Sequence, residues 1–90
     1  MVHEDIDKIV MLLDSMVDDS SIPRNVRSRI ADAKRRLESS EDFAAKVSTA
    51  VYALDDVSND INMPMHARTL IWNILSELER IKATELSQQT

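Results

Sequence analysis

Apolar residues recur at steps of three and four in four stretches of the chain, at about residues 3–18, 23–38, 41–58 and 64–84. This spacing places them on one face of an α-helix, because the helix completes a turn about every 3.6 residues. The fourth stretch has the broadest apolar stripe. The apolar positions are Ile6, Ile9, Val10, Leu13, Met16 and Val17; Val26, Ile30, Ala33 and Leu37; Phe43, Val47, Ala50, Val51, Leu54 and Val57; and Leu70, Ile71, Ile74, Leu75, Leu78 and Ile81.

Short polar breaks separate these stretches. Residues 18–21 interrupt the first pattern, and Pro23 favours a new helix start because proline is tolerated in the first turn of a helix. Residues 59–62 and Pro64 repeat that arrangement before the fourth stretch. The middle break is shorter, and we expect a serine at position 39 or 40 to cap the third helix in a variant of the capping box.

The composition of the chain supports a helical fold. Its 90 residues include no glycine and two prolines, and aromatic residues make up 3%. Such a chain favours helices over sheets, whose tight hairpin turns usually need glycine. We therefore predict an all-α, single-domain protein over residues 1–90, a four-helix bundle of two antiparallel helical hairpins at about 3–38 and 41–84. A tail follows at 85–90, of which we expect residues 87–90 to be frayed.

The two hairpins resemble each other in sequence. Residues 10–37 align with 51–78 at a constant offset of 41 without gaps. Amphipathic periodicity accounts for the shared apolar positions, but it does not require the shared polar and proline positions. The period lies in the range of HEAT and armadillo helical repeats, and two units must either close into a bundle or bury an open face against another chain. The informative matches are Asp14 with Asp55, Asp19 with Asp60, Pro23 with Pro64 and Arg27 with Arg68.

The repeated acidic and basic residues suggest structural roles. Asp14 and Arg27 lie at similar distances before and after the first turn, which places them at similar heights on antiparallel helices. We therefore predict a partly buried ion pair between Asp14 and Arg27, and an equivalent pair between Asp55 and Arg68. We expect the aspartates in the turns, at 19 and 60, to accept N–H groups at the start of the following helix.

Charge is distributed unevenly along the chain. The total is −5, but residues 1–20 carry −5, residues 21–40 carry +4 and residues 41–60 carry −4. The net sign disfavours a general binder of polyanions. The second helix is the best candidate for a nucleic-acid face. However, acidic helices flank it, and no aromatic residues interleave with its cations to stack on bases. A solvated face, or one whose cations pair with carboxylates of the same chain, better explains the cations of this helix. Its cations are Arg24, Arg29, Lys34, Arg35 and Arg36.

Residues suited to catalysis or metal binding form no recognisable motif. His3 and His66 lie far apart in sequence, the serines lack an associated His and Asp pattern, and phosphate-binding glycine loops are impossible without glycine. We expect no enzyme activity, no cofactor, no metal and no small-molecule ligand. The chain has no cysteine, no stretch as apolar as a membrane span and no recognisable signal peptide, so we expect a cytoplasmic protein without membrane contact.

The fourth helix carries the main candidate for a partner surface. Trp72 lies at the edge of its apolar stripe, with Leu75 and Glu79 completing that edge. This arrangement fits an ordinary bundle core and a subunit interface equally well. Our leading hypothesis is a non-enzymatic interaction or scaffold protein that forms a homo-oligomer or binds a helical partner through this helix. The alternative is a small RNA- or nucleoprotein-associated adaptor that uses the basic second helix.

Two segments also resemble a known family. Residues 49–79, TAVYALDDVSNDINMPMHARTLIWNILSELE, and residues 20–27, SSIPRNVR, resemble a family of short, uncharacterised archaeal proteins of about this length. The resemblance covers most of the chain and is strongest at residues 57–60 and 63–73. It implies an all-helical fold and a cytoplasmic location, and it implies no assigned activity and no catalytic or ligand residues.

Overall fold

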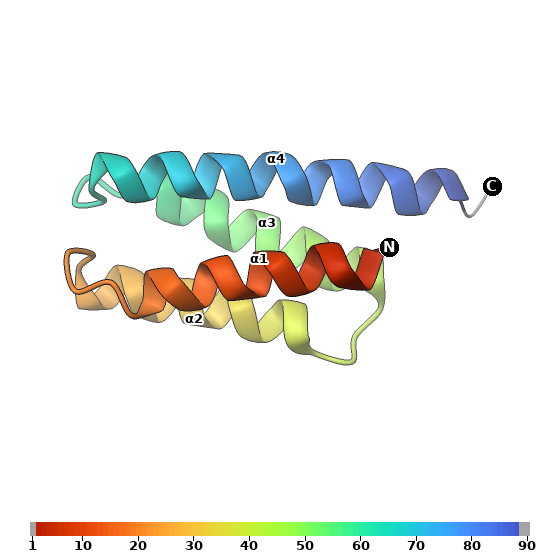
Figure 1. The fold of residues 1–90 in the computed structure, drawn as a ribbon, viewed down its shortest axis with the longest axis horizontal. Helices are drawn as coiled ribbons and strands as arrows, with labels where there is room; N and C mark the ends of the chain where they lie inside the picture. Colours follow the sequence, from red (N-terminus) through yellow and green to blue (C-terminus); the bar gives the residue numbers. More distant parts are fainter. Residues whose placement is uncertain (1, 89–90) are drawn as a thin grey trace.

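The computed structural model describes the backbone of residues 2–88 and the side chains of residues 5–84. It contains the four predicted helices and, in the described residues, no strand: α1 (Val2–Val17), α2 (Arg24–Glu38), α3 (Phe43–Ser58) and α4 (Met65–Gln88) (Figure 1). Their bounds agree with the sequence prediction to within two residues except at the end of α4. That helix continues through residues 85–88 of the predicted tail, although fraying is expected from residue 87, and residues 89 and 90 lie outside the described part of the chain.

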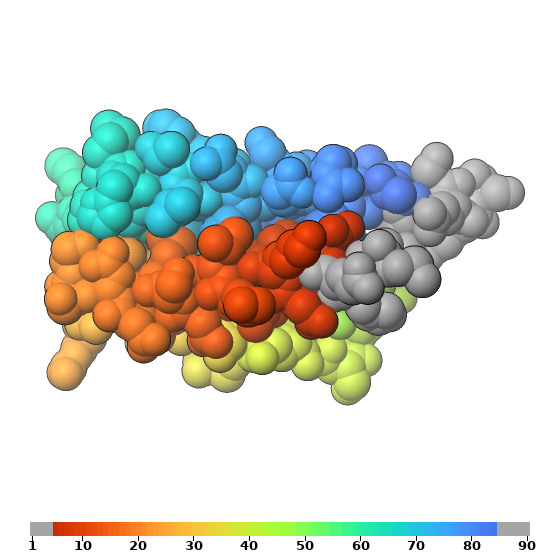
Figure 2. Space-filling model, viewed as in Figure 1, coloured from red at the N-terminus to blue at the C-terminus, as the bar shows by residue number. Residues whose placement is uncertain are grey.

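The helices form a closed four-helix bundle. Each helix packs against its neighbours in the chain, and α1 also packs against α4, which closes the ring. Figure 2 shows α1 and α4 meeting side by side along one face, with the two 18–23 and 59–64 turns at the same end. Of the two arrangements open to a duplicated hairpin, the chain therefore adopts the bundle rather than an open stack.

The core lies along the bundle axis and follows the predicted stripes except at Leu70, which is exposed. Every helix contributes its apolar face, and burying one such side chain stabilises the fold by roughly 1.5–3 kcal/mol. Ile22 and Met63, which precede the two prolines, are also buried and close the turn end of the core. The largest side chains that are almost fully buried are Leu13, Ile22, Val26, Ile30, Leu37, Val47, Leu54, Val57, Ile71, Ile74, Leu78 and Ile81.

The break between α2 and α3 differs from the predicted capping. Asp42 is the N-cap of α3, and its carboxylate accepts a hydrogen bond from the Ala45 N–H at 3.2 Å. Ser39 instead closes α2, where its hydroxyl donates to the Arg36 carbonyl at 2.8 Å. The two serines therefore precede the cap because the connection is longer than the sequence pattern suggested.

The two turns that follow α1 and α3 have the same hydrogen-bond pattern at the 41-residue offset. The carbonyls of Asp19 and Asp60 accept the N–H three residues later, each at 3.1 Å. The carbonyls of Pro23 and Pro64 accept the first helical bonds, each at 2.9 Å. The internal repeat is thus a repeat of backbone geometry as well as of sequence.

Among the helices that the structure describes, none is both long enough and apolar enough to cross a membrane.

Candidate functional site

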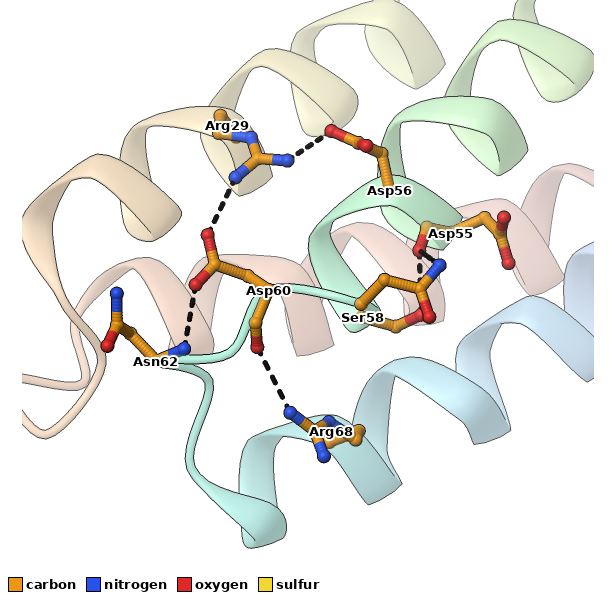
Figure 3. A network of polar contacts seen from close by, with 8 residues as sticks. Arg29, Asp55, Asp56, Ser58, Asp60, Asn62 and Arg68 are labelled. Atoms are coloured by element: carbon orange, nitrogen blue, oxygen red, sulfur yellow. Dashed lines mark hydrogen bonds and ion pairs between the residues drawn. The ribbon is translucent and has the colours of Figure 1, made fainter.

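Arg29 on α2 faces the second turn instead of solvent. Its guanidinium forms an ion pair with Asp56 and another with Asp60, the latter with 3.1 Å between Nη1 and Oδ2 (Figure 3). Asp60 is largely buried, and its other carboxylate oxygen accepts the Asn62 N–H at 2.8 Å. Arg29 therefore ties the first hairpin (α1 and α2) to the second hairpin (α3 and α4).

Most other cations of the predicted nucleic-acid face also have carboxylate partners. Exposed Arg24 is the exception, with no ion pair among the described side chains. The face therefore offers less unpaired positive charge than the sequence suggests, as expected for a chain whose acidic segments flank its basic one. The pairs are Lys34 with Asp14 at 2.7 Å and Glu38 at 3.8 Å, Arg35 with Asp32, and Arg36 with Glu41 at 3.8 Å.

The predicted pair between Asp14 and Arg27 is wrong. Asp14 binds Lys34 instead, about two helical turns further along α2. The prediction assumed a symmetric turn, but the chain continues the helical path beyond α1: the N–H of residue 18 donates to the Asp14 carbonyl at 3.2 Å. Consequently α2 starts nearer to the end of the bundle than α1 finishes (Figure 1), and this shifts the pairing.

The predicted pair between Asp55 and Arg68 is also wrong. Arg68 Nη2 donates to the backbone carbonyl of Asp60 at 3.0 Å (Figure 3). The carboxylate of Asp55 has no ion-pair partner among the described side chains. The Nε atoms of Arg27 and Arg68 are both buried without a hydrogen-bond partner, so the duplicated arginines do share one environment.

Asp19, Ser21 and His66 come together in the fold although no Ser, His and Asp pattern is visible along the chain. His66 Nε2 lies 3.1 Å from the Asp19 carboxylate and 3.3 Å from the Ser21 hydroxyl. The Ser21 hydroxyl donates to Asp19 at 2.6 Å, and its N–H donates to the same oxygen at 2.9 Å. The hydrogen bond from the Ser21 hydroxyl, then the contact with His66 and then the Ser21 N–H lower the pKa of Asp19 to about 2.

This cluster does not have the geometry of a hydrolytic triad. In a triad the histidine binds the serine through one ring nitrogen and the carboxylate through the other. Here a single nitrogen of His66 faces both partners, and the Ser21 proton goes to the carboxylate. The arrangement instead joins the first turn to the start of α4, as Arg29 joins α2 to the second turn. The two turn aspartates accept N–H groups within their own turns and not, as predicted, from the first residues of the following helix. Asp19 accepts the N–H of Ser21, and Asp60 accepts that of Asn62.

Trp72, Leu75 and Glu79 lie on the flank of α4 next to α3. Trp72 is 51% exposed and borders a hollow of about 390 Å³, which we call the Trp72 hollow. Glu79 borders a second hollow of about 290 Å³, the Tyr52 hollow. Leu75, between them along the helix, is partly buried against the core. The Trp72 hollow is lined by Ser58, Asn59, Ile61, Arg68 and Trp72, and the Tyr52 hollow by Ser48, Val51, Tyr52, Asp55, Glu79 and Lys82.

Two exposed apolar residues of this region were not singled out from the sequence. Tyr52 is 79% exposed and Ile61 is 91% exposed. Tyr52 falls outside the apolar stripe of α3, and Ile61 lies within a polar turn, where the first hairpin has Ser20. An apolar side chain in a polar break was the available signal. We refer to both hollows together with Leu75 as the α3–α4 surface.

The corresponding surface of the first hairpin has a different chemistry. At the 41-residue offset, Trp72 corresponds to Ala31 and Leu75 to Lys34. In the first hairpin the lysine binds Asp14 and covers the junction between α1 and α2 with an ion pair. In the second hairpin Asp55 is retained, but a leucine replaces the lysine and a tryptophan replaces the alanine, so this surface is more apolar than its equivalent in the first hairpin.

Comparison with known proteins places the chain in a family. The sequence profile of the Uncharacterised protein family (UPF0147) matches residues 1–81. A UPF0147 protein of Methanocaldococcus jannaschii is 44% identical over 82% of this chain and 81% of its own length. A UPF0147 protein of Archaeoglobus fulgidus is 37% identical over 90% of this chain and 93% of its own length.

Solved structures agree with this assignment. The crystal structure of a UPF0147 protein from Thermoplasma acidophilum has a TM-score of 0.83 at 32% identity, covering 88% of this chain and 94% of that one. The crystal structure of a protein of unknown function has a TM-score of 0.82 at 40% identity, covering 86% and 89%. The four-helix fold expected from the sequence is thereby confirmed, as is the resemblance to a short archaeal family. The chain belongs to the uncharacterised protein family UPF0147.

Proposed function

We propose that the protein is a non-enzymatic helical interaction module that associates with a second copy of itself through the α3–α4 surface. The proposal includes a cytoplasmic location, because a chain without cysteine gains nothing from an oxidising compartment. It requires no cofactor, metal or small-molecule ligand.

The contrast between the two hairpins carries this proposal. Where the first hairpin has the ion-paired Lys34, the second has Leu75, and where the first has Ala31, the second has a half-exposed tryptophan. The fold accepts Ala31 and the ion-paired Lys34 in its first hairpin, so bundle stability alone does not require a tryptophan and a leucine at the equivalent positions. Tryptophan and tyrosine are enriched among residues that dominate binding energy, and Trp72 and Tyr52 both belong to this surface.

Nucleic-acid binding by α2 receives less support. Four of its five candidate cations already have carboxylate partners, and a phosphate would have to displace those partners. The salt dependence of gel shifts with RNA tests this alternative, because phosphate contacts weaken steeply as salt concentration rises.

Light scattering at micromolar concentration tests the proposal. We expect a mass of at least twice the 10.2 kDa of one chain. The double variant Trp72→Ala/Leu75→Lys gives the second hairpin the residues of the first, and the introduced lysine has Asp55 available as Asp14 is to Lys34. We expect this variant to keep its helical circular dichroism and to become a monomer.

The variant Met11→Lys is the matched control. Met11 is an exposed apolar residue of α1 and lies outside the α3–α4 surface, so the control should associate as the native chain does. A native protein that stays monomeric across the concentration range would contradict the proposal. So would a double variant that folds and still associates.

A further inference from the structure

The flank of α4 next to α3 carries a regular row of side chains. Successive members are separated by three, four, three, four and three residues, so they form one seam along the helix. The seam runs beside the buried row of α4, and it extends for about 25 Å at 1.5 Å per residue. Its members, which we call the α4 seam, are Met65, Arg68, Trp72, Leu75, Glu79 and Lys82.

We propose that two copies of the chain pair their α4 seams in antiparallel orientation, with Trp72 of each copy against Leu75 of the other. This inference rests on the proposed self-association and specifies its geometry. The spacing then places Arg68 opposite Glu79 of the second copy, and Met65 opposite Lys82. Two apolar contacts form the centre, and an arginine–glutamate pair flanks each side.

Charge selects this orientation over the parallel one. A parallel, in-register pair would place Arg68 against its own equivalent, and likewise Glu79 and Lys82. Three like-charge contacts along one seam disfavour that pairing. The antiparallel pairing turns two of these repulsive contacts into attractive ones and leaves Lys82 beside an uncharged side chain.

Charge also selects the register. A shift of one heptad toward the C-terminal end of α4 places Glu79 against Leu75 of the second copy, which buries a carboxylate against an apolar side chain. A shift in the other direction leaves Glu79 and Lys82 outside the paired region and shortens the contact. The proposed register uses the whole seam.

The environment of Arg68 suits a carboxylate from outside the chain. Its Nη2 donates to the Asp60 carbonyl at 3.0 Å (Figure 3), and among the described side chains no carboxylate forms an ion pair with its guanidinium. The side chain also lines the Trp72 hollow, which is about 390 Å³ in volume. Glu79 of a second copy would bring a carboxylate to this guanidinium, and a charge-assisted hydrogen bond there is about twice as strong as a neutral one.

Cysteine cross-linking tests the orientation, because the native chain has no cysteine. The double variant Met65→Cys/Lys82→Cys places thiols at opposite ends of the seam, too far apart to react within one chain. We expect a short thiol cross-linker to convert it to a covalent dimer, and the single variants Met65→Cys and Lys82→Cys to cross-link at least tenfold less. Equal cross-linking of a single variant would indicate parallel pairing and overturn the inference.

Charge reversal gives an independent measurement. Glu79→Arg should raise the dimer dissociation constant at least tenfold, since the introduced arginine would face Arg68 of the second copy. Glu77→Arg is the control, because Glu77 is equally on α4 but pairs with Arg80 away from the seam. A native dimer in which none of the cysteine variants cross-links, or in which both reversals act equally, overturns the pairing but keeps the proposed self-association. A monomeric native chain overturns both.

Discussion

Arg29 and Asp60 connect the two hairpins through an ion pair with 3.1 Å between Nη1 and Oδ2. Asp60 also accepts the N–H of Asn62, so one carboxylate both shapes the second turn and holds α2 against it (Figure 3). A residue that the sequence suggested for nucleic-acid binding therefore has a structural role. Its contact spans 31 positions of the chain and exists only in the folded protein.

The first prediction concerns Arg29. Arg29→Ala should lower the free energy of unfolding by about 1 kcal/mol or more, because it leaves the largely buried Asp60 without its cation. Arg24→Ala, on the exposed part of the same helix, should change it by less than about 0.5 kcal/mol. Urea unfolding followed by circular dichroism measures both. Equal effects would show that the ion pair contributes nothing to the fold.

The second prediction concerns the pKa of Asp19. Ser21 makes the largest contribution to lowering this pKa to about 2, so Ser21→Ala should raise it toward the ordinary value of 3.8. An NMR titration of the carboxyl carbon follows the change directly. Ser20→Ala, which alters the neighbouring serine, should leave the pKa of Asp19 at about 2. A pKa that moves equally in both variants would refute the assigned cause.

The third prediction gives the pH dependence that follows. The folded-state pKa of Asp19 is depressed, so its contribution to stability is present above the unfolded value of 3.8 and is lost as pH falls toward about 2. Asp19→Asn cannot titrate and should lose less stability than the native chain across this interval. Denaturant unfolding at several pH values between about 4 and 2 measures the difference in slope. Parallel curves for the two proteins would contradict it.

The fourth prediction separates the duplicated arginines. Arg68→Met removes the donor to the Asp60 carbonyl and should destabilise the fold by about 1 kcal/mol. Arg27→Met should cost less than about 0.5 kcal/mol, because the buried Nε of Arg27 has no hydrogen bond to lose and methionine retains most of the apolar stem. Thermal unfolding of the two variants compares them. The prediction fails if Arg27→Met is the more damaging change.

The fifth prediction concerns the start of α3. Asp42→Ala removes the side chain that caps the helix and should cost about 1 kcal/mol of stability. Ser40→Ala should have little effect, although the sequence pattern made a serine at 39 or 40 the expected cap. Chemical unfolding of both variants decides between the two assignments. A larger loss for Ser40→Ala would restore the sequence-based one.

The sequence predicted the helices well because each is an amphipathic unit whose pattern is local. The 41-residue repeat likewise predicted that the two turns would match, and their hydrogen bonds do, from Asp19 and Asp60 to the carbonyls of the two prolines. Pairing between helices was harder to predict. The expected partner of Asp14 was displaced by about two helical turns because the chain continues its helical path beyond α1 before α2 begins.

The amino-acid pattern by itself determined four helices, their approximate ends and the duplication, because helix periodicity and proline positions act over a few residues. Only the tertiary structure decided which charges pair between helices. Closing the ring brings α2 onto α3 and α1 onto α4, and it thereby joins Arg29 to Asp60 and His66 to Asp19 across 31 and 47 positions. It also pairs Arg29 and Lys34 of α2 with carboxylates of other elements while leaving Trp72 half exposed. The two hairpins therefore differ on this surface: the first carries the ion-paired Lys34, and the second carries the half-exposed Trp72.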